Sequence, residues 1–316
     1  MDNLTHSLAG ALLGQMGLKR LTGRAMATLI IAANIPDLDA IASVLGTESL
    51  AIRRGITHGP PAMLILPLLL TGAVLAWEKW RRNKAGQPVR FWPLLLLACL
   101  GTWSHPALDW LNSYGVRLLE PFSHRWFAGD TLFIVDVWIW AALIVSFLWS
   151  RRREKRGGDW QRPAWIGFAA IGAYILANGL ITGRAEAHTH AVLEQRGHRA
   201  ELVVANPLPF TFWNRRMLWR DAEVHGDGDY GLLTGVRLPD ASCPNRLDDP
   251  ALTAARGRSD VEAFLFWSRM PYVVEENGRT VLKDQRFSSS LRQSAGRTVG
   301  EYDPFTVVLS PEPSGQ

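Results

Sequence analysis

Three histidines and three aspartates lie inside or beside long apolar segments, where ionisable side chains are costly and therefore indicate a function. A single residue of this kind is as often a packing or interhelical hydrogen-bonding residue as a functional one. The prediction therefore depends on the whole set. Imidazole and carboxylate groups together favour zinc, manganese or iron over calcium. We predict one or two divalent ions, with zinc or manganese preferred. The predicted ligands are His6, Asp37, Asp39, His58, His105 and Asp109.

The spacing of these residues is compatible with a shared ion. His105 and Asp109 stand four residues apart, so in a helix they lie on one face. Asp37 and Asp39 are two apart and would diverge in a regular helix. Pro36 removes a backbone donor, and an irregular stretch there can turn both carboxylates inward.

Anion recognition is predicted next to His58. This histidine comes just before Pro60, a residue that suits the first turn of a helix. The positive end of that helix would favour an anion. Arg53 and Arg54 precede His58 and could bind a phosphate or carboxylate, or could only contact lipid headgroups.

The same residues predict hydrolysis, because a bound ion can lower the pKa of a coordinated water to about 7 and so supply a nucleophile. A carboxylate would act as general base. The candidates are Asp39 and Asp109, with Asp130 and Asp136 as possible supporting residues. Asp130 could instead cap the following helix, and Asp136 could pair with Arg117 or Arg125.

Long uncharged runs predict the elements that position these groups. Runs of about 20 apolar residues are long enough to cross a bilayer as helices. We therefore expect a polytopic α-helical membrane domain over residues 1–183 with about six spans. The predicted spans cover residues 4–18, 25–47, 60–77, 91–110, 132–149 and 164–182.

The distribution of Lys and Arg predicts which way the spans face. Fourteen of these residues lie in the connections 19–24, 78–90 and 151–162, against four on the opposite side. Basic residues concentrate in cytoplasmic loops, so the candidate ligands fall on the extracytoplasmic side. The basic balance of 34 Lys and Arg against 29 Asp and Glu does not indicate nucleic acid, because no nucleic-acid-binding motif accompanies it.

Residues 184–316 predict a small α+β domain outside the membrane, which the topology also places on the extracytoplasmic side. Strands or hairpins are expected over 201–204, 210–219 and 273–283, and a short amphipathic helix over 261–270.

The polar residues also form ordered motifs: Asp2-Asn3-Leu4-Thr5-His6-Ser7, Pro36-Asp37-Leu38-Asp39, Arg54-Gly55-Ile56-Thr57-His58 and Ser104-His105-Pro106-Ala107-Leu108-Asp109. With these motifs the chain resembles the YdjM-like membrane-bound, metal-dependent hydrolases of bacterial inner membranes. The segments 127–130, 133–136 and 264–272 extend the resemblance over nearly the whole chain.

The resemblance implies a multi-pass protein of the bacterial inner membrane whose hydrolase site comprises the six predicted ligands. One departure stands in the third motif. Relatives commonly have His-Arg-Gly before the Thr-His pair, whereas this chain has Arg53-Arg54-Gly55, and Gly59 stands where serine is usual.

Two hypotheses remain open. The first is a hydrolase that acts on an anionic lipid-linked or amphiphilic substrate at the membrane surface. The second is a non-catalytic metal-binding or transport-related protein whose outer domain binds a partner. The inner halves of the spans are almost purely apolar, which favours a one-sided site and hence the enzyme. The lipid bilayer is the partner that both require, and the oligomeric state is left open.

Overall fold

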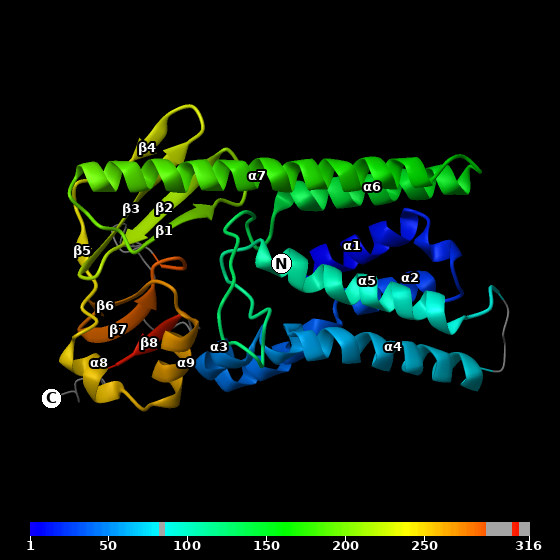
Figure 1. Cartoon of the computed structure of the whole chain (residues 1–316), viewed down its shortest axis with the longest axis horizontal. Helices are drawn as coiled ribbons and strands as arrows, with labels where there is room; N and C mark the ends of the chain where they lie inside the picture. Colours follow the sequence, from blue (N-terminus) through cyan, green and yellow to red (C-terminus); the bar gives the residue numbers. More distant parts are fainter. Residues whose placement is uncertain (82–85, 289–304, 310–316) are drawn as a thin grey trace. The chain divides into compact units, whose positions relative to one another are not determined.

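The structure, a computed structural model, describes residues 1–81, 86–288 and 305–309. The chain divides into two compact units (Figure 1). Unit 1 comprises Met1–Asp39 and Arg54–Gly179, and unit 2 comprises Ala40–Arg53 and Leu180–Gln316. Two of the basic residues in the predicted 78–90 connection, Arg82 and Lys84, lie outside the described residues.

Unit 1 is helical, and its first helices pack closely. Helix α1 (Asn3–Gln15) begins at the cap Asp2, whose carboxylate accepts from the backbone N–H groups of Leu4 and Thr5. The short turn η1 (Leu18–Arg20) leads to α2 (Ala25–Ala32). A small side chain permits the close approach of α1 and α2, since a Cβ on Gly10 would lie 2.6 Å from the carbonyl oxygen of Leu29.

The segment after α2 leaves α-helical geometry at the predicted aspartates. It continues as the 3₁₀ segment η2 (Ile35–Glu48), which is interrupted at Gly46, and then as α3 (Ser49–Ile52). The irregular stretch expected beside Pro36 is therefore present. The last part of this segment, Ala40–Arg53, belongs to unit 2.

The remaining helices are α4 (Pro60–Trp80), which follows the turn η3 (Ile56–His58), α5 (Phe91–Trp110), α6 (Val137–Lys155) and α7 (Gln161–Gln195). Among the described residues, four helical segments are long and apolar enough to cross a membrane: Ala25–Ile52, Pro60–Trp80, Phe91–Trp110 and Gln161–Gln195.

The predicted count of six spans is therefore not confirmed. Helix α1 has 13 residues, about 20 Å of helix, which is short of the ~30 Å hydrocarbon core. Helix α6 begins at Val137 rather than Leu132, and its last five residues are charged. Its apolar part is consequently too short to count as a span by length and composition.

Unit 2 is rich in strands, as expected for the C-terminal region. One sheet has the order β1 (Leu202–Pro207), β2 (Asn214–Arg220), β3 (Val224–Gly231) and β4 (Gly235–Arg237), with β5 (Cys243–Pro244) also paired to β3. A second contains β6 (Pro271–Glu276), β7 (Arg279–Asp284) and β8 (Thr306–Val308). The predicted hairpin over 273–283 is β6–β7. The short helices are α8 (Pro250–Ala255) and α9 (Ser259–Trp267).

The core of unit 2 forms between the first sheet and the end of α7 (Figure 1). Ile181, Ala185 and Leu193 of α7 pack against Met217 and Tyr230 of the sheet. These residues bury one face of the last part of α7, so the sheet is fixed to the helix around the end of its uncharged run, residues 163–183.

Candidate metal centre

The site begins with two histidines that helix packing brings together. His6 on α1 and His105 on α5 each stand four residues from a glycine, so each shares a helix face with it. Both glycines, Gly10 and Gly101, receive α2 at close range: a Cβ on Gly101 would lie 2.6 Å from the Cβ of Ala32. The two imidazole rings consequently stack with centroids 3.7 Å apart.

The ring of His105 is oriented by a backbone carbonyl. Helix α2 ends at Ala32. In a continued α-helix the amide of Asp37 would donate to the carbonyl of Ala33, but here it donates to the carbonyl of Asn34. The carbonyl of Ala33 instead accepts from Nδ1 of His105 at 2.6 Å. Because a carbonyl only accepts, Nδ1 carries the hydrogen, and in the neutral ring Nε2 is the basic atom. Nε2 lies 3.5 Å from Oδ2 of Asp109 and 3.6 Å from Oδ1 of Asp37.

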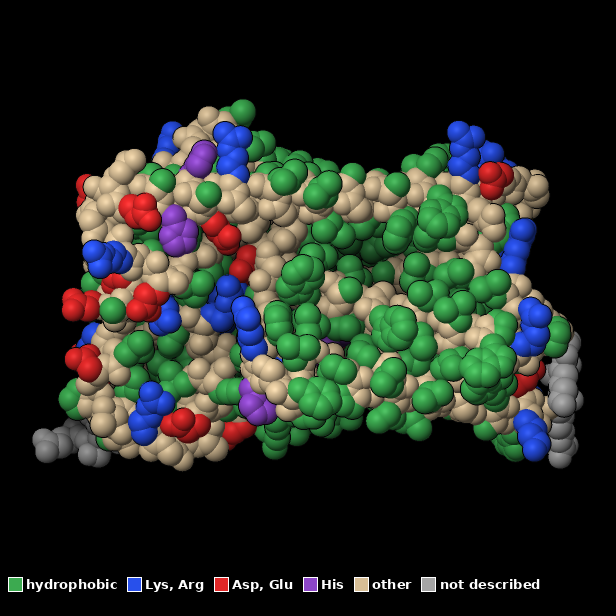
Figure 2. Space-filling view, viewed as in Figure 1, with side chains coloured by type: hydrophobic (Ala, Val, Ile, Leu, Met, Phe, Trp, Pro, Cys, Tyr) green, Lys and Arg blue, Asp and Glu red, His purple; other side chains and the backbone are tan. Residues whose placement is uncertain are grey.

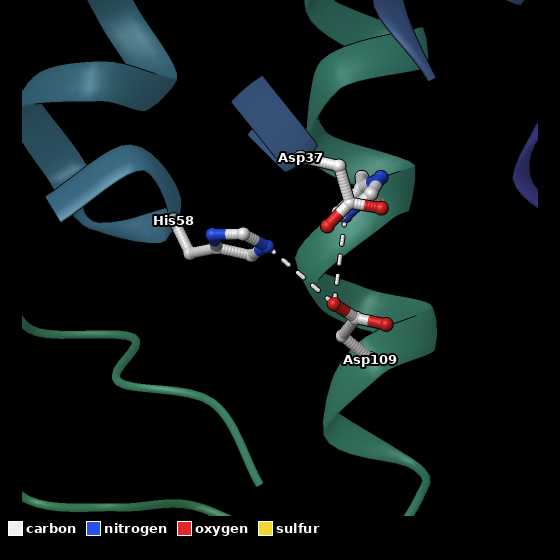
Figure 3. A group of neighbouring side chains, drawn as sticks. Asp37, His58 and Asp109 are labelled. Carbon is white, nitrogen blue, oxygen red and sulfur yellow. Dashed lines mark ion pairs between the residues drawn. The ribbon is translucent and has the colours of Figure 1, made fainter. Parts of the chain in front are cut away.

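His58 is oriented by a hydroxyl in the same way. The hydroxyl of Thr57 donates to Oδ2 of Asp39 at 2.7 Å, so toward His58 it can only accept. Nδ1 of His58, 2.9 Å away, therefore donates to it. This leaves Nε2 of His58 facing Oδ2 of Asp109 at 3.4 Å, and Figure 3 shows the two side chains pointing toward one another beside Asp37.

Four of the six predicted ligands form one compact group. One ligand atom from each of Asp37, His58, His105 and Asp109 lies within 4.8 Å of all the others. The donor set fits a divalent ion, because several buried atoms that face the group have no hydrogen-bond partner among the described residues: His6 Nε2, His58 Nε2, His105 Nε2 and Asp109 Oδ2. Buried polar atoms are normally paired, and a metal ion would satisfy these.

The other two predicted ligands lie at the edge of this group. His6 is not one of the four, although its Nε2 lies 3.4 Å from Oδ1 of Asp109. Asp39 also lies outside the four, and its Oδ2 accepts from the backbone N–H of Arg54 at 2.8 Å as well as from Thr57. Its position orients the loop that carries His58.

The two predicted anion-binding arginines differ. Arg54 is buried, and its Nε lies 3.1 Å from Oδ2 of Asp109. Its guanidinium donates to Asn112 and to the carbonyl of Gly115, which holds it at the site. Arg53 follows α3 as its C-terminal cap residue and belongs to unit 2. The amino group of Met1 also contacts Asp109.

The two predicted supporting aspartates are placed by other elements. Asp136 caps α6 by accepting from the amides of Trp138 and Ile139, and it accepts from the hydroxyl of Tyr174 at 3.2 Å. The helix that Asp130 was expected to cap is therefore capped by Asp136. Asp130 is buried and has a left-handed backbone with φ of 47°. Neither is a member of the four-residue group.

Some positioning groups were not predicted from sequence. Thr57 precedes His58 directly in the sequence. A hydroxyl residue next to a candidate ligand could have indicated its role as an orienting group. The carbonyl of Ala33 has no side-chain signal at all. Gly59 admits the backbone of Glu120, whose carbonyl oxygen would overlap any Cβ at that position. A serine here, which the family resemblance led us to expect, would therefore need a different path for the 111–136 connection.

Two comparisons with known proteins bear on this site. A family model described as YdjM inner membrane protein matches residues 1–185, a range that contains all six predicted ligands. A protein of Bacillus subtilis (strain 168) named Uncharacterized protein YfhP is 27% identical over 156 residues. That match covers 46% of this chain and 45% of the relative, so the chain matches less than half of that protein's length. No solved structure matches the chain.

Proposed function

This chain belongs to the YdjM inner membrane protein family, and on that premise we propose that it is a metal-dependent hydrolase. The observation that supports this most directly is the pair of buried Nε2 atoms, on His58 and His105, that converge on Asp109 while each Nδ1 is held by another acceptor. Ligand histidines are usually oriented through the second ring nitrogen in this way.

The proposed division of roles follows from the contacts. Asp37, His58, His105 and Asp109 would hold a divalent ion, which when bound supplies an activated water and offsets negative charge. Of the two candidate bases we favour Asp39. Its Oδ2 is fixed by Arg54 and Thr57, whereas its buried Oδ1 has no hydrogen-bond partner among the described residues and can accept a proton.

The proposed substrate is an anionic amphiphile. Arg54 places a buried cation beside Asp109, where it could bind a phosphate or carboxylate through its remaining donors. The apolar side chains of Leu38 and Ile56 are exposed and adjoin site residues in the sequence. They would let an acyl or isoprenoid chain remain in lipid while its headgroup reaches the aspartates.

We propose that the site faces the extracytoplasmic side. Two ion pairs support this: Lys19–Glu154 at 2.5 Å and Arg24–Glu78 at 2.9 Å bring the three basic connections together at one end of unit 1. In Figure 2, apolar side chains cover the middle of the helices, and basic ones gather at the right-hand end. Arg90 at this end and His105 are separated along α5 by about 22 Å of helix. If the basic end is cytoplasmic, the site is on the opposite side.

The test of the hydrolase is metal analysis and turnover by purified full-length protein in detergent, with phospholipid and isoprenoid-phosphate panels. We expect bound divalent ion and chelator-sensitive release of headgroup or phosphate, both lost in His58→Ala/His105→Ala. His188→Ala, which changes an exposed histidine of α7, is the matched control. Wild-type metal content in the folded double variant would exclude this site, and turnover of soluble peptides or sugars alone would exclude the substrate class.

A non-catalytic role is the second candidate, and the Arg54–Asp109 ion pair is the observation that favours it, because this pair already compensates part of the buried negative charge. In that case no lipid should be turned over, with or without chelator. A chelator-induced fall in melting temperature without turnover of any lipid would then identify the metal-binding form of this non-catalytic role.

A further inference from the structure

Two connections of the first sheet in unit 2 are apolar where hairpin loops are normally polar. The β1–β2 loop, residues 208–213, reads Leu-Pro-Phe-Thr-Phe-Trp, and the β3–β4 turn, residues 232–234, reads Leu-Leu-Thr. Turns usually contain Gly, Asn, Asp or Ser. The β6–β7 turn of the same unit follows that rule with Asn277 and Gly278. We call the two apolar connections the hairpin tips.

The hairpin tips lie together at one end of the sheet. Asn214, which begins β2, is paired with Gly231, which ends β3, and the amide of Leu232 donates to the carbonyl of Trp213 at 3.0 Å. Their side chains are nevertheless open to solvent: Phe210 is 65%, Trp213 43%, Leu232 41% and Leu233 97% exposed. Contiguous exposed apolar side chains mark a surface that binds a partner or a membrane.

A contact with α7 places this end of the sheet relative to the bilayer. Nε of Arg215, the residue after Asn214, donates to the hydroxyl of Thr182 at 3.3 Å. Thr182 is near the end of the uncharged run 163–183 of α7, and Arg184 is the first charged residue after it. The hairpin tips therefore lie next to a strand end that contacts α7 close to the end of its uncharged run.

We infer that the hairpin tips insert into the membrane interface at the surface from which α7 emerges. Trp and aliphatic side chains suit this depth, and neither tip contains a charged residue that would oppose insertion. Lipid is the occupant because the sheet packs on α7 around the end of its uncharged run, and α7 is long and apolar enough to cross a membrane. Unit 2 thus binds the bilayer through its own sheet in addition to its covalent attachment, independently of the proposed hydrolase.

The test uses full-length protein with Cys99 and Cys243 replaced by Ala, reconstituted in vesicles of phosphatidylethanolamine and phosphatidylglycerol. Nitroxide labels are placed on Leu233→Cys in the tip or on Asn277→Cys in the polar turn. Collision with oxygen, which partitions into lipid, and with a water-soluble nickel complex gives the depth of each label. We expect the ratio of oxygen to nickel accessibility to be several-fold higher at 233 than at 277.

Equal ratios at the two positions would overturn the inference. Protection of the label at 233 from both reagents would also overturn it, since that pattern indicates contact with protein. Because any tag on a single tip could disturb its own insertion, Phe210→Cys provides a second label on the other tip. Quenching of a fluorophore at 210 by doxyl-labelled lipid, with none at 277, is the expected result. If neither tip label contacts lipid, the inferred membrane contact of unit 2 is wrong.

Discussion

The imidazole rings of His6 and His105 stack with 3.7 Å between their centroids and 16° between their planes. This relationship is set by the helices rather than by the histidines. Gly10 and Gly101, each one turn from its histidine, let α1 and α5 approach the same helix, α2. The geometry of the candidate site therefore depends on two residues with no side chain.

Gly101→Ala should destabilise the protein, although alanine is the better helix former. The added Cβ would lie 2.6 Å from that of Ala32 and 2.9 Å from the carbonyl oxygen of Leu29, and such overpacking typically costs about 1–3 kcal/mol. Thermal unfolding in detergent measures the effect, and metal content should fall with it. Gly172→Ala is the control, since beyond its own helix backbone no described atom lies within 4 Å of its Cβ position. Equal melting temperatures for the two variants would refute this packing argument.

Thr57→Val should weaken metal binding while leaving the fold intact. The substitution keeps the shape of the side chain but removes the hydroxyl that joins Asp39 to His58. Loss of an orienting partner typically costs about 10–100-fold in metal affinity, and Thr57→Ser should recover most of it. Competitive titration with a chromogenic chelator measures the affinity. Thr71→Val, at a buried hydroxyl of α4 with no partner among the described residues, should bind metal like the wild type.

Single cysteines should separate the two sides of the membrane. Ala254→Cys in α8 is expected to react with an impermeant thiol reagent in intact cells, whereas Gly158→Cys, between α6 and α7, should react only after permeabilisation. Both positions are exposed, so burial does not bias the comparison. The reverse pattern would place the candidate metal centre on the cytoplasmic side.

Unit 2 should lose stability in acid through Asp284. Burial alone would raise the pKa of this carboxyl, but the guanidinium of Arg286, 2.9 Å away, and the hydroxyl of Ser268 hold its pKa below the ordinary value of 3.8. A lowered pKa means that the unfolded chain binds the proton more readily. The contribution is therefore present above pH 3.8 and is lost as the pH falls below that value toward the folded-state pKa.

The measurement is the pH dependence of thermal unfolding. Asp284→Asn should lower the melting temperature at neutral pH, because the buried Arg286 would lose its ion pair. The expected loss of stability is about 3–5 kcal/mol. The variant should also show a flatter pH dependence than the wild type as the pH falls below 3.8. Identical pH profiles would show that the pair does not contribute.

The sequence predicted the parts of the site that depend on regular geometry. His105 and Asp109 share a helix face because α5 is regular, and the i, i+4 rule suffices there. The departure of Asp39 from the metal group could not be predicted, because it depends on how the 3₁₀ segment η2 turns that carboxylate toward Arg54 and Thr57. No spacing rule covers an irregular segment.

The span count failed for a related reason. An uncharged run shows that residues tolerate an apolar environment, but it does not show that they are helical. Residues 132–136 are uncharged up to Asp136, yet they form no helix, and α6 begins only after that cap. For α1, hydropathy did not reveal that the helix ends after 13 residues. The β6–β7 hairpin of unit 2 was easier to predict, because the sequence Asn277-Gly278 is typical of a tight turn between two strands.

The four clustered residues, Asp37, His58, His105 and Asp109, all occur before α5 ends at Trp110. During synthesis on the ribosome they are complete while roughly two thirds of the chain has still to be translated. All four ligands are therefore synthesised before the strands of unit 2 exist, and we expect ion capture to begin in the nascent protein once the helices that carry them have packed.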